Sequence, residues 1–117
     1  MKRFWVYIIS NKSRRLYTGL ADDLALRVFE HKHKLFPDSF TAQYNYDTLV
    51  YFEPFPRWFP GRMRELQIKS WRREKKIRLI ESINPDWADL SAGWQEDPSW
   101  AAIPEAEWRL KPRKKPL

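Results

Sequence analysis

The sequence predicts an α/β fold of the α+β type, with the element order β-β-α-β-α-α in a single domain. A length of 117 residues leaves room for one core, and a hydrophobic content of 43% is enough to fill it. Short runs of β-branched and aromatic residues alternate with longer stretches of helical periodicity. These observations exclude wholesale disorder and indicate three strands and three helices.

The first two strands are predicted to form an antiparallel hairpin. Residues 4–9 are β-branched or aromatic throughout, which is typical of a strand that is buried on both faces. Residues 11–14 are turn-like, and the β-prone residues 15–20 complete the pair. Gly19 indicates a bend or a close approach to the backbone.

The next element is a helix that ends at Pro37. Asp22 or Asp23 can cap its start with a side-chain oxygen, and Leu24 and Val28 share the stripe that faces the core.

A third strand is predicted at residues 48–55, after a polar and aromatic loop at residues 38–45. Three prolines at the end of this strand and after it predict an irregular connection; they are Pro54, Pro56 and Pro60.

Residues 61–83 have a helical composition with two different apolar faces. Met63 and Leu66 share the first face, and the second consists of Ile77, Ile80 and Ile83. The change of face predicts a bend at residues 70–73. Asn84-Pro85 then ends the second helix, because a residue before proline disfavours the α conformation.

Residues 95–117 are predicted to be an extension outside the domain of residues 1–94. Together with Trp94 they contain four prolines and no sustained period, which favours a poorly ordered or surface-draped segment. Exposed tryptophans are costly, so Trp94, Trp100 and Trp108 either pack back on the domain or offer a docking surface to a protein partner.

The charge balance favours a polyanionic partner. Lys and Arg number 22 against 15 Asp and Glu, a net charge of +7, and nucleic acid is the default candidate. A solvated basic surface is the alternative. The absence of cysteine excludes disulfides and thiolate metal sites and fits the cytoplasm, and no apolar run is long enough to span a membrane.

Two pairs of residues could carry chemistry. Tyr7 and Tyr17 lie on adjacent predicted strands, where side chains on one face can converge on a water or a phosphate. Arg27 and His31 are four residues apart on a predicted helix, so they could hold two oxygens of one phosphate. The alternative for each pair is structural: ordinary strand aromatics and a solvated helix face.

Glu65 is a lone, partly exposed carboxylate in an arginine-rich helix. It could hold Mg²⁺ with water and phosphate completing the coordination, or form a helix pair with Lys69. A cluster of cations around one aromatic follows and could track a phosphate backbone or form the solvated side of two helices; its members are Lys69, Trp71, Arg72, Arg73, Lys75, Lys76 and Arg78.

Taken in order, these residues resemble the GIY-YIG endonuclease family, and more closely its small stand-alone bacterial members. The two half-motifs of the family are similar to Val6-Tyr7-Ile8 and Tyr17-Thr18-Gly19. The resemblance covers residues 3–94 and continues through residues 22–24, Arg27, 30–32, 40–41, 49–53, 64–65 and 84–87. Val6 and Thr18 depart from the half-motifs, Ala42 stands where the family suggests a basic residue, and Pro60-Gly61 could shift the helix start.

The resemblance implies a small three-stranded antiparallel sheet flanked by helices, and hydrolysis of phosphodiester bonds with one divalent ion, Mg²⁺ or Mn²⁺. Glu65 would ligate the ion, and Arg27 would bind the scissile phosphate. Tyr7 or Tyr17 would take a proton from the attacking water, and His31 would assist that tyrosine or hold the phosphate.

The resemblance also implies DNA as the partner, with branched or damaged structures as candidate substrates in repair or recombination. Contacts to its backbone would come from Lys69, Arg72, Arg73 and Lys76. Two other interpretations stay open: a catalytically silent nucleic-acid-binding module with the same fold, and a protein-interaction adaptor that uses the extension.

Overall fold

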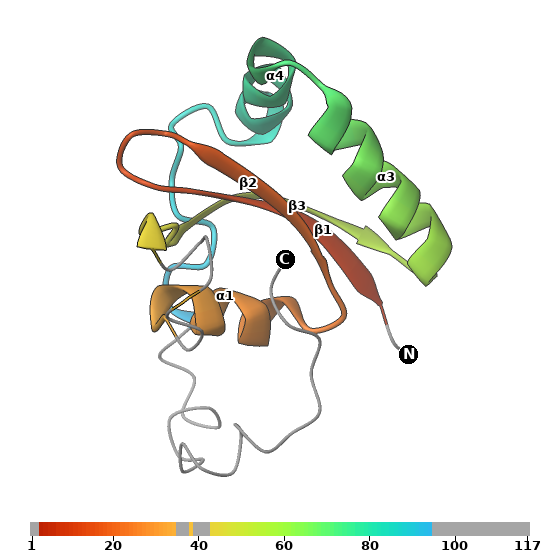
Figure 1. Cartoon of the computed structure of the whole chain (residues 1–117), viewed down its shortest axis with the longest axis horizontal. Helices are drawn as coiled ribbons and strands as arrows, with labels where there is room; N and C mark the ends of the chain where they lie inside the picture. Colours follow the sequence, from red (N-terminus) through yellow and green to blue (C-terminus); the bar gives the residue numbers. More distant parts are fainter. Residues whose placement is uncertain (1–2, 35–37, 39–42, 95–117) are drawn as a thin grey trace, which may run out of the picture.

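A computed structural model of the chain describes residues 3–34, 38 and 43–94. The predicted order β-β-α-β-α-α is confirmed, and the strands form one antiparallel sheet in the order β2-β1-β3 (Figure 1). The elements are β1 (Phe4–Ser10), β2 (Leu16–Ala21), α1 (Leu24–Lys32), β3 (Thr48–Phe55), α3 (Trp58–Ser70) and α4 (Arg73–Ile83).

The sheet is built around β1, which is paired on both sides and is buried from Val6 to Ser10. This burial explains why its sequence is apolar throughout. Tyr7 lies opposite Gly19 on β2 and opposite Phe52 on β3. Because β2 pairs only with β1, it is an edge strand of the sheet.

Helices cover both faces of the sheet. Figure 1 shows α1 on one face and α3 with α4 on the other. The buried residues of the α1 face are Tyr7, Ile9, Ala21, Leu24, Val28, Tyr46 and Leu49. The buried hydrophobic residues of the α3–α4 face are Val6, Ile8, Val50, Tyr51, Ile68 and Ile80. The alternation along β1 therefore assigns Tyr7 to the α1 face and its neighbours Val6 and Ile8 to the other.

The first helix is shorter than predicted. Asp23, not Asp22, is the N-cap residue, and its carboxylate accepts a hydrogen bond of 3.1 Å from the backbone of Leu26. The helix ends at Lys32 rather than at Pro37, because Lys34 takes a left-handed conformation with φ of 52°. Pro37 itself and residues 39–42 of the predicted 38–45 loop lie outside the described residues.

The prediction that the irregular connection extends through Pro60 was wrong, because α3 already begins at Trp58. Pro60 lies in the first turn, where its missing N–H would have had no partner within the helix. Gly61 packs closely on β2, since a Cβ at this position would lie 3.1 Å from Leu20 Cδ1.

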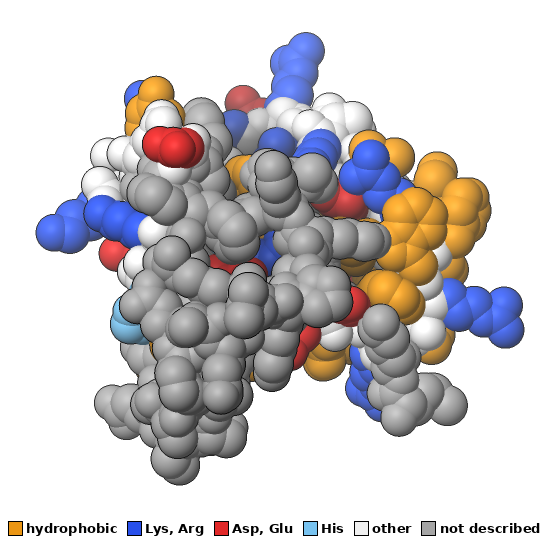
Figure 2. Space-filling model, turned by 60° about the horizontal axis from the view of Figure 1, so that its bottom comes forward, with side chains coloured by type: hydrophobic (Ala, Val, Ile, Leu, Met, Phe, Trp, Pro, Cys, Tyr) orange, Lys and Arg blue, Asp and Glu red, His pale blue; other side chains and the backbone are white. Residues whose placement is uncertain are grey.

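The buried face of α3 also differs from the prediction. Met63 and Leu66 are exposed, at 49% and 42%, whereas the buried face holds Gly61, Glu65 and Ile68. Exposed hydrophobic side chains gather on the side of the molecule where α3 begins (Figure 2). The apolar spacing was misleading because a buried carboxylate occupies the position where a hydrophobic residue is the normal choice.

The predicted bend at residues 70–73 is confirmed, since α3 ends at Ser70 and α4 begins at Arg73. Of the expected apolar face of α4, Ile80 is fully buried but Ile83 is 57% exposed. Asn84 is the C-cap residue, as the Asn-Pro signal predicts.

The described chain ends beside the α1 face of the sheet. Trp94 packs on Phe52 with ring centroids 5.8 Å apart, so this tryptophan packs back on the domain. The predicted extension at residues 95–117 lies outside the described residues. In the part of the chain that is described, no helix has the length and apolar character needed to cross a membrane.

Candidate active site

Tyr7 and His31 form the centre of the candidate site. Tyr7 is fully buried on β1, and its hydroxyl lies 3.1 Å from Nε2 of His31 on α1. The tyrosine ring crosses β2 at Gly19, where a Cβ would lie only 2.5 Å from Tyr7 Cζ. Any larger residue at position 19 would therefore displace the ring, which gives the glycine of the second half-motif a steric role.

Tyr17 approaches the same histidine from β2. Its ring centroid lies 6.0 Å from that of His31 and 6.2 Å from that of Tyr46, both edge to face. Its hydroxyl is buried and has no hydrogen-bond partner among the described residues. A buried hydroxyl without a partner is rare, and the atom is available to a water or a phosphate oxygen.

Arg27 is a buried cation next to these rings. Only 4% of the residue is exposed, and its Nε lies 3.3 Å from the carboxylate of Glu30. Arg27 acts on Tyr7 through its charge and a side-chain hydrogen bond, both of which lower the pKa of the phenol. The predicted shared face of Arg27 and His31 is thus directed toward the tyrosines.

Burial keeps the aromatic groups of the site neutral. It raises the pKa of Tyr7 to about 12, against the opposing effect of Arg27, and it also raises the pKa of Tyr17. Burial and the charge of Arg27 lower the pKa of His31 to about 3. At neutral pH the imidazole is therefore uncharged, and an unprotonated Nε2 can accept the Tyr7 hydroxyl proton.

Glu65 comes from α3 on the opposite face of the sheet, and it is fully buried rather than partly exposed as predicted. Arg62 Nη1 donates a hydrogen bond of 2.8 Å to its Oε1, and Lys69 Nζ lies 2.9 Å from its Oε2. The charge of Glu65 raises the pKa of both Tyr7 and Tyr17. The carboxylate and the phenols are therefore close enough to interact, although they come from different faces.

These residues fit one hydrated divalent ion. In the described segments no group of three or more His, Cys, Asp or Glu residues could enclose a metal. Mg²⁺ needs fewer protein ligands, because it keeps several waters and takes one or two carboxylates together with phosphate oxygens. Oε2 of Glu65 is buried and receives no aligned hydrogen bond, so it is the oxygen that suits such an ion.

The four predicted nucleic-acid contacts are spread over the end of α3 and the start of α4. Lys69 contacts Glu65. Burial and, after it, the charge of Lys69 lower the pKa of Lys76. Arg73 is the first residue of α4, and Arg72 is exposed as the N-cap residue of that helix.

Trp71, the aromatic within the cation cluster, packs against the core of the α3–α4 face. Lys75 and Arg64 cover its ring, with Nζ and Cζ at 4.4 and 5.2 Å from the centroid. Its role here is structural, because those contacts occupy the ring.

Sequence reasoning missed three residues around the site: Glu30, Tyr46 and Arg62. Glu30 and Arg62 are three residues from Arg27 and Glu65, so helical spacing could have found both ion pairs. Tyr46 follows a loop and had no such signal. Asn84 donates to the carbonyl oxygens of Val50 and Ala88 and caps α4, so its role is structural.

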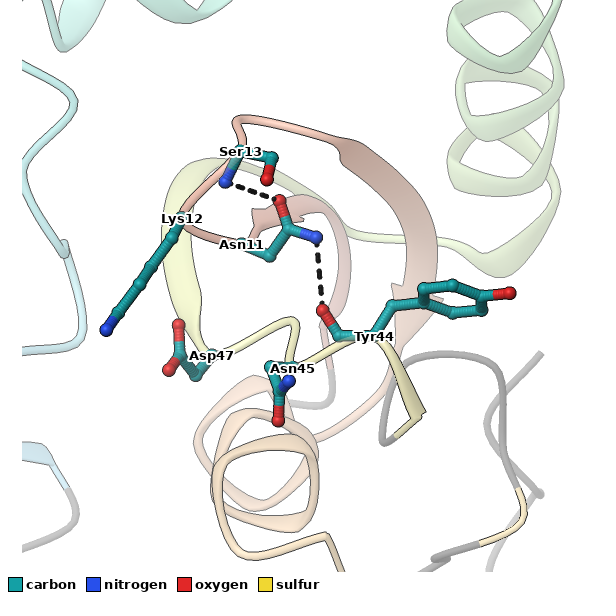
Figure 3. A pocket seen from close by; sticks show the side chains of 6 residues that line it. All are labelled: Asn11, Lys12, Ser13, Tyr44, Asn45 and Asp47. Carbon is teal, nitrogen blue, oxygen red and sulfur yellow. Dashed lines mark hydrogen bonds between the residues drawn. The ribbon is translucent and has the colours of Figure 1, made fainter.

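A polar pocket of about 370 Å³ lies at the turn between β1 and β2 (Figure 3). Asn11 shapes it by donating to the carbonyl of Tyr44 at 3.1 Å and accepting from the backbone of Ser13 at 3.0 Å. Lys12, Asn45 and Asp47 complete its lining. None of the five candidate catalytic and metal-ligating residues lines this pocket. The hydrogen bond from Asn11 to Tyr44 connects the hairpin turn to the segment before β3.

The fold and the site together define a class of small α+β proteins in which tyrosines, an arginine and a histidine lie on one face of the sheet and a buried glutamate comes from a helix on the other face. The family described as "GIY-YIG catalytic domain" matches residues 3–78. The chain therefore belongs to the GIY-YIG family, a family of nucleases.

Similar proteins are small bacterial ones named UPF0213. A UPF0213 protein of Staphylococcus saprophyticus is 34% identical over 80 residues, which cover 68% of this chain and 96% of that protein. A UPF0213 protein of Staphylococcus aureus strain Mu3 is 35% identical over 81 residues, 69% of this chain and 98% of its own. The solution structure of a UPF0213 protein from Bacillus halodurans has a TM-score of 0.48 at 22% identity and covers 76% of this chain and 94% of that one.

Proposed function

We propose that this protein is a metal-dependent endonuclease that hydrolyses phosphodiester bonds of DNA. The observation that carries the proposal is the convergence of Tyr7, Tyr17 and His31 with a buried arginine and a buried glutamate. Membership of a nuclease family supports the same reaction. Residues 1–94 would form the catalytic domain, acting in the cytoplasm, where bacterial DNA lies.

Arg27 is proposed to bind the scissile phosphate. Its guanidinium is permanently charged and planar, which suits the oxygens of a phosphate and the charge that develops on them. Glu30, at 3.3 Å, orients the side chain and balances its charge while no phosphate is bound. A bound phosphate would be a second anion beside the buried guanidinium, whose five N–H donors can serve two acidic groups.

Tyr7 is proposed to accept the proton of the attacking water while His31 takes the phenol proton. The 3.1 Å contact between the Tyr7 hydroxyl and Nε2 provides the path for this second transfer. The lowered pKa of His31 opposes it in the free protein, and part of that lowering comes from Arg27. A phosphate on Arg27 would cancel this part and raise the basicity of the imidazole.

Tyr17 is proposed to position the water. Its buried hydroxyl lacks a hydrogen-bond partner among the described residues, so a water between the tyrosines would satisfy it. A divalent ion held at Glu65 would supply the charge that polarises the phosphate and stabilises the leaving oxygen. Lys69, Arg72, Arg73 and Lys76 are proposed to contact the DNA backbone on either side of the site.

The proposal is tested with supercoiled plasmid and a branched DNA, each with Mg²⁺, Mn²⁺ or a chelator. The purified protein should nick or cut at least one of them in a metal-dependent way, and Glu65→Gln should abolish the cleavage. Glutamine keeps the shape of the buried side chain, so it is a safer substitution than alanine. Equal cleavage by both proteins would overturn the assignment of Glu65.

Binding without cleavage under every condition would instead identify a silent nucleic-acid-binding module. Comparison of the two substrates also tests the proposed preference for branched DNA. The remaining part of the proposal, a protein partner for residues 95–117, is tested by capture with and without that segment.

A further inference from the structure

Two cations of its own helix hold the Glu65 carboxylate, one at each oxygen. Arg62 Nη1 donates to Oε1 at 2.8 Å, and Lys69 Nζ lies 2.9 Å from Oε2. The glutamate side chain is fully buried, whereas the side chains of Arg62 and Lys69 are 35% and 36% exposed. The two cations therefore reach a buried anion from the solvent side.

Burial distinguishes this arrangement from an ordinary helix ion pair. Exposed pairs at these spacings stabilise a helix only slightly, but a buried carboxylate without counter-charge is strongly disfavoured. The two contacts also differ, because Arg62 makes an aligned hydrogen bond while Oε2 faces Lys69 without one. Lys69 can therefore leave Oε2 at a lower free-energy cost than Arg62 can leave Oε1.

We propose that Arg62 and Lys69 are exchangeable counter-ions of Glu65, which pass to the phosphates of the nucleic acid when a divalent ion takes the carboxylate. The inference rests on the proposed function, which assigns that ion to Glu65. Both side chains are long and partly exposed, so they can turn outward while the helix stays in place.

The charge balance of this group supports the exchange. Glu65, Arg62 and Lys69 together carry one net positive charge, and with a divalent ion they would carry three. Burial and the positive charge of Lys69 lower the pKa of Lys76, so these two lysines already repel each other. The released cations would add to this positive cluster of Lys69 and Lys76. Such a cluster attracts phosphates. Metal and DNA should therefore each raise the affinity for the other by the same factor, here about tenfold.

The distinctive readout is the salt dependence of DNA binding. Each phosphate contact adds about 0.9 to the slope of log Kd against log salt concentration. Without metal, Lys69→Met should leave this slope unchanged, because Lys69 is held by Glu65. With saturating Mn²⁺ the slope of the variant should be lower by about one than that of the parent protein. Arg62→Met should behave in the same way.

The experiment measures binding of a fluorescein-labelled DNA duplex over a salt series, with Mn²⁺ or chelator. All proteins carry Tyr17→Phe to keep the DNA intact, which a gel verifies. Arg57→Met is the matched control, since Arg57 is an exposed arginine that precedes the same helix. Its effect on the slope should be the same with and without metal. Thermal unfolding of each variant confirms folding, and Lys69→Gln replaces any methionine variant that does not fold.

Slopes that fall equally with and without Mn²⁺, or that do not fall at all, would overturn the exchange. Lys69→Arg should restore the behaviour of the parent protein, because it keeps the cation. Mn²⁺ titration of Glu65→Gln separates this failure from failure of the proposed function. If the Glu65→Gln variant keeps its Mn²⁺ affinity, Glu65 is not the metal ligand, and both the proposed metal site and the exchange are overturned. If the variant loses Mn²⁺ affinity but the Lys69 and Arg62 variants show unaltered salt slopes, the exchange alone is overturned.

Discussion

At Gly19 the absence of a side chain allows Tyr7 to reach His31. Gly19→Ala would bring a Cβ to 2.5 Å from Tyr7 Cζ, so the ring must move. We expect a loss of about 1–3 kcal/mol in the free energy of unfolding, measured by denaturant titration, together with loss of cleavage. In a Tyr7→Ala background the same substitution should cost almost nothing, and an equal cost in both backgrounds would contradict the steric explanation.

His31 should make stability depend on pH. Its pKa is lowered from 6.5 to about 3, so between these values the unfolded chain binds a proton that the folded chain does not. Stability contributed by the neutral imidazole is present above pH 6.5 and is lost as the pH falls, at up to about 1.4 kcal/mol per pH unit.

This prediction is checked by urea unfolding between pH 6.5 and 5, above the range where the carboxylates titrate. His31→Phe should lose less stability over this interval than the protein with histidine. His33→Phe is the matched control, because His33 is exposed. Parallel pH profiles for the original protein and the His31 variant would contradict the assignment.

The candidate site was predictable from the sequence in its residue types but not in its environment. Tyr7, Tyr17, Arg27, His31 and Glu65 were each identifiable by motif and spacing. The structure places both tyrosines against His31 with Arg27 beside Tyr7, and Glu65 acts on the tyrosines through its charge from the other face of the sheet. That Glu65 is fully buried was not predictable, because burial depends on how α3 packs against the sheet.

At the scale of single elements, α4 offers a comparison between two identical residues. Ile80 is fully buried and Ile83 is 57% exposed, although both belong to the apolar spacing of the sequence. Ile80→Ala should cost about 2–5 kcal/mol in the free energy of unfolding through the lost contacts and the cavity. Ile83→Ala should stay within about 0.5 kcal/mol. Denaturant titration checks both, and similar costs would contradict the packing of α4.

The element boundaries show where local sequence rules suffice. The strand at residues 48–55 and the stop at Asn84 were predicted correctly, because proline and β-branched residues act locally. The start of α3 was predicted incorrectly. Proline disrupts the interior of a helix, but it is tolerated in the first turn, where Pro60 lies. The buried face of α3 was missed for a different reason: Arg62 and Lys69 make a glutamate acceptable there.

At the scale of the whole molecule, residues after α4 connect this helix to α1 and β3. The side chain of Asp89 forms an ion pair with Lys32 of α1 and accepts a hydrogen bond from the backbone of Leu49 on β3. The backbone of Leu90 also donates to Leu49 at 2.8 Å, and Trp94 covers Phe52. The integrity of the domain should therefore require the chain up to residue 94.

Truncation tests this boundary. A protein of residues 1–94 should keep the free energy of unfolding within about 1 kcal/mol of the full chain and retain metal-dependent cleavage, because every contact just described is preserved. A protein of residues 1–88 should lose several kcal/mol, on the order of 3, through the removed ion pair, hydrogen bonds and aromatic cover. Thermal and denaturant unfolding of the three lengths provide the measurement. If removing residues 95–117 destabilised the protein as much as the longer truncation, the extension would belong to the core rather than to a separate partner-binding segment.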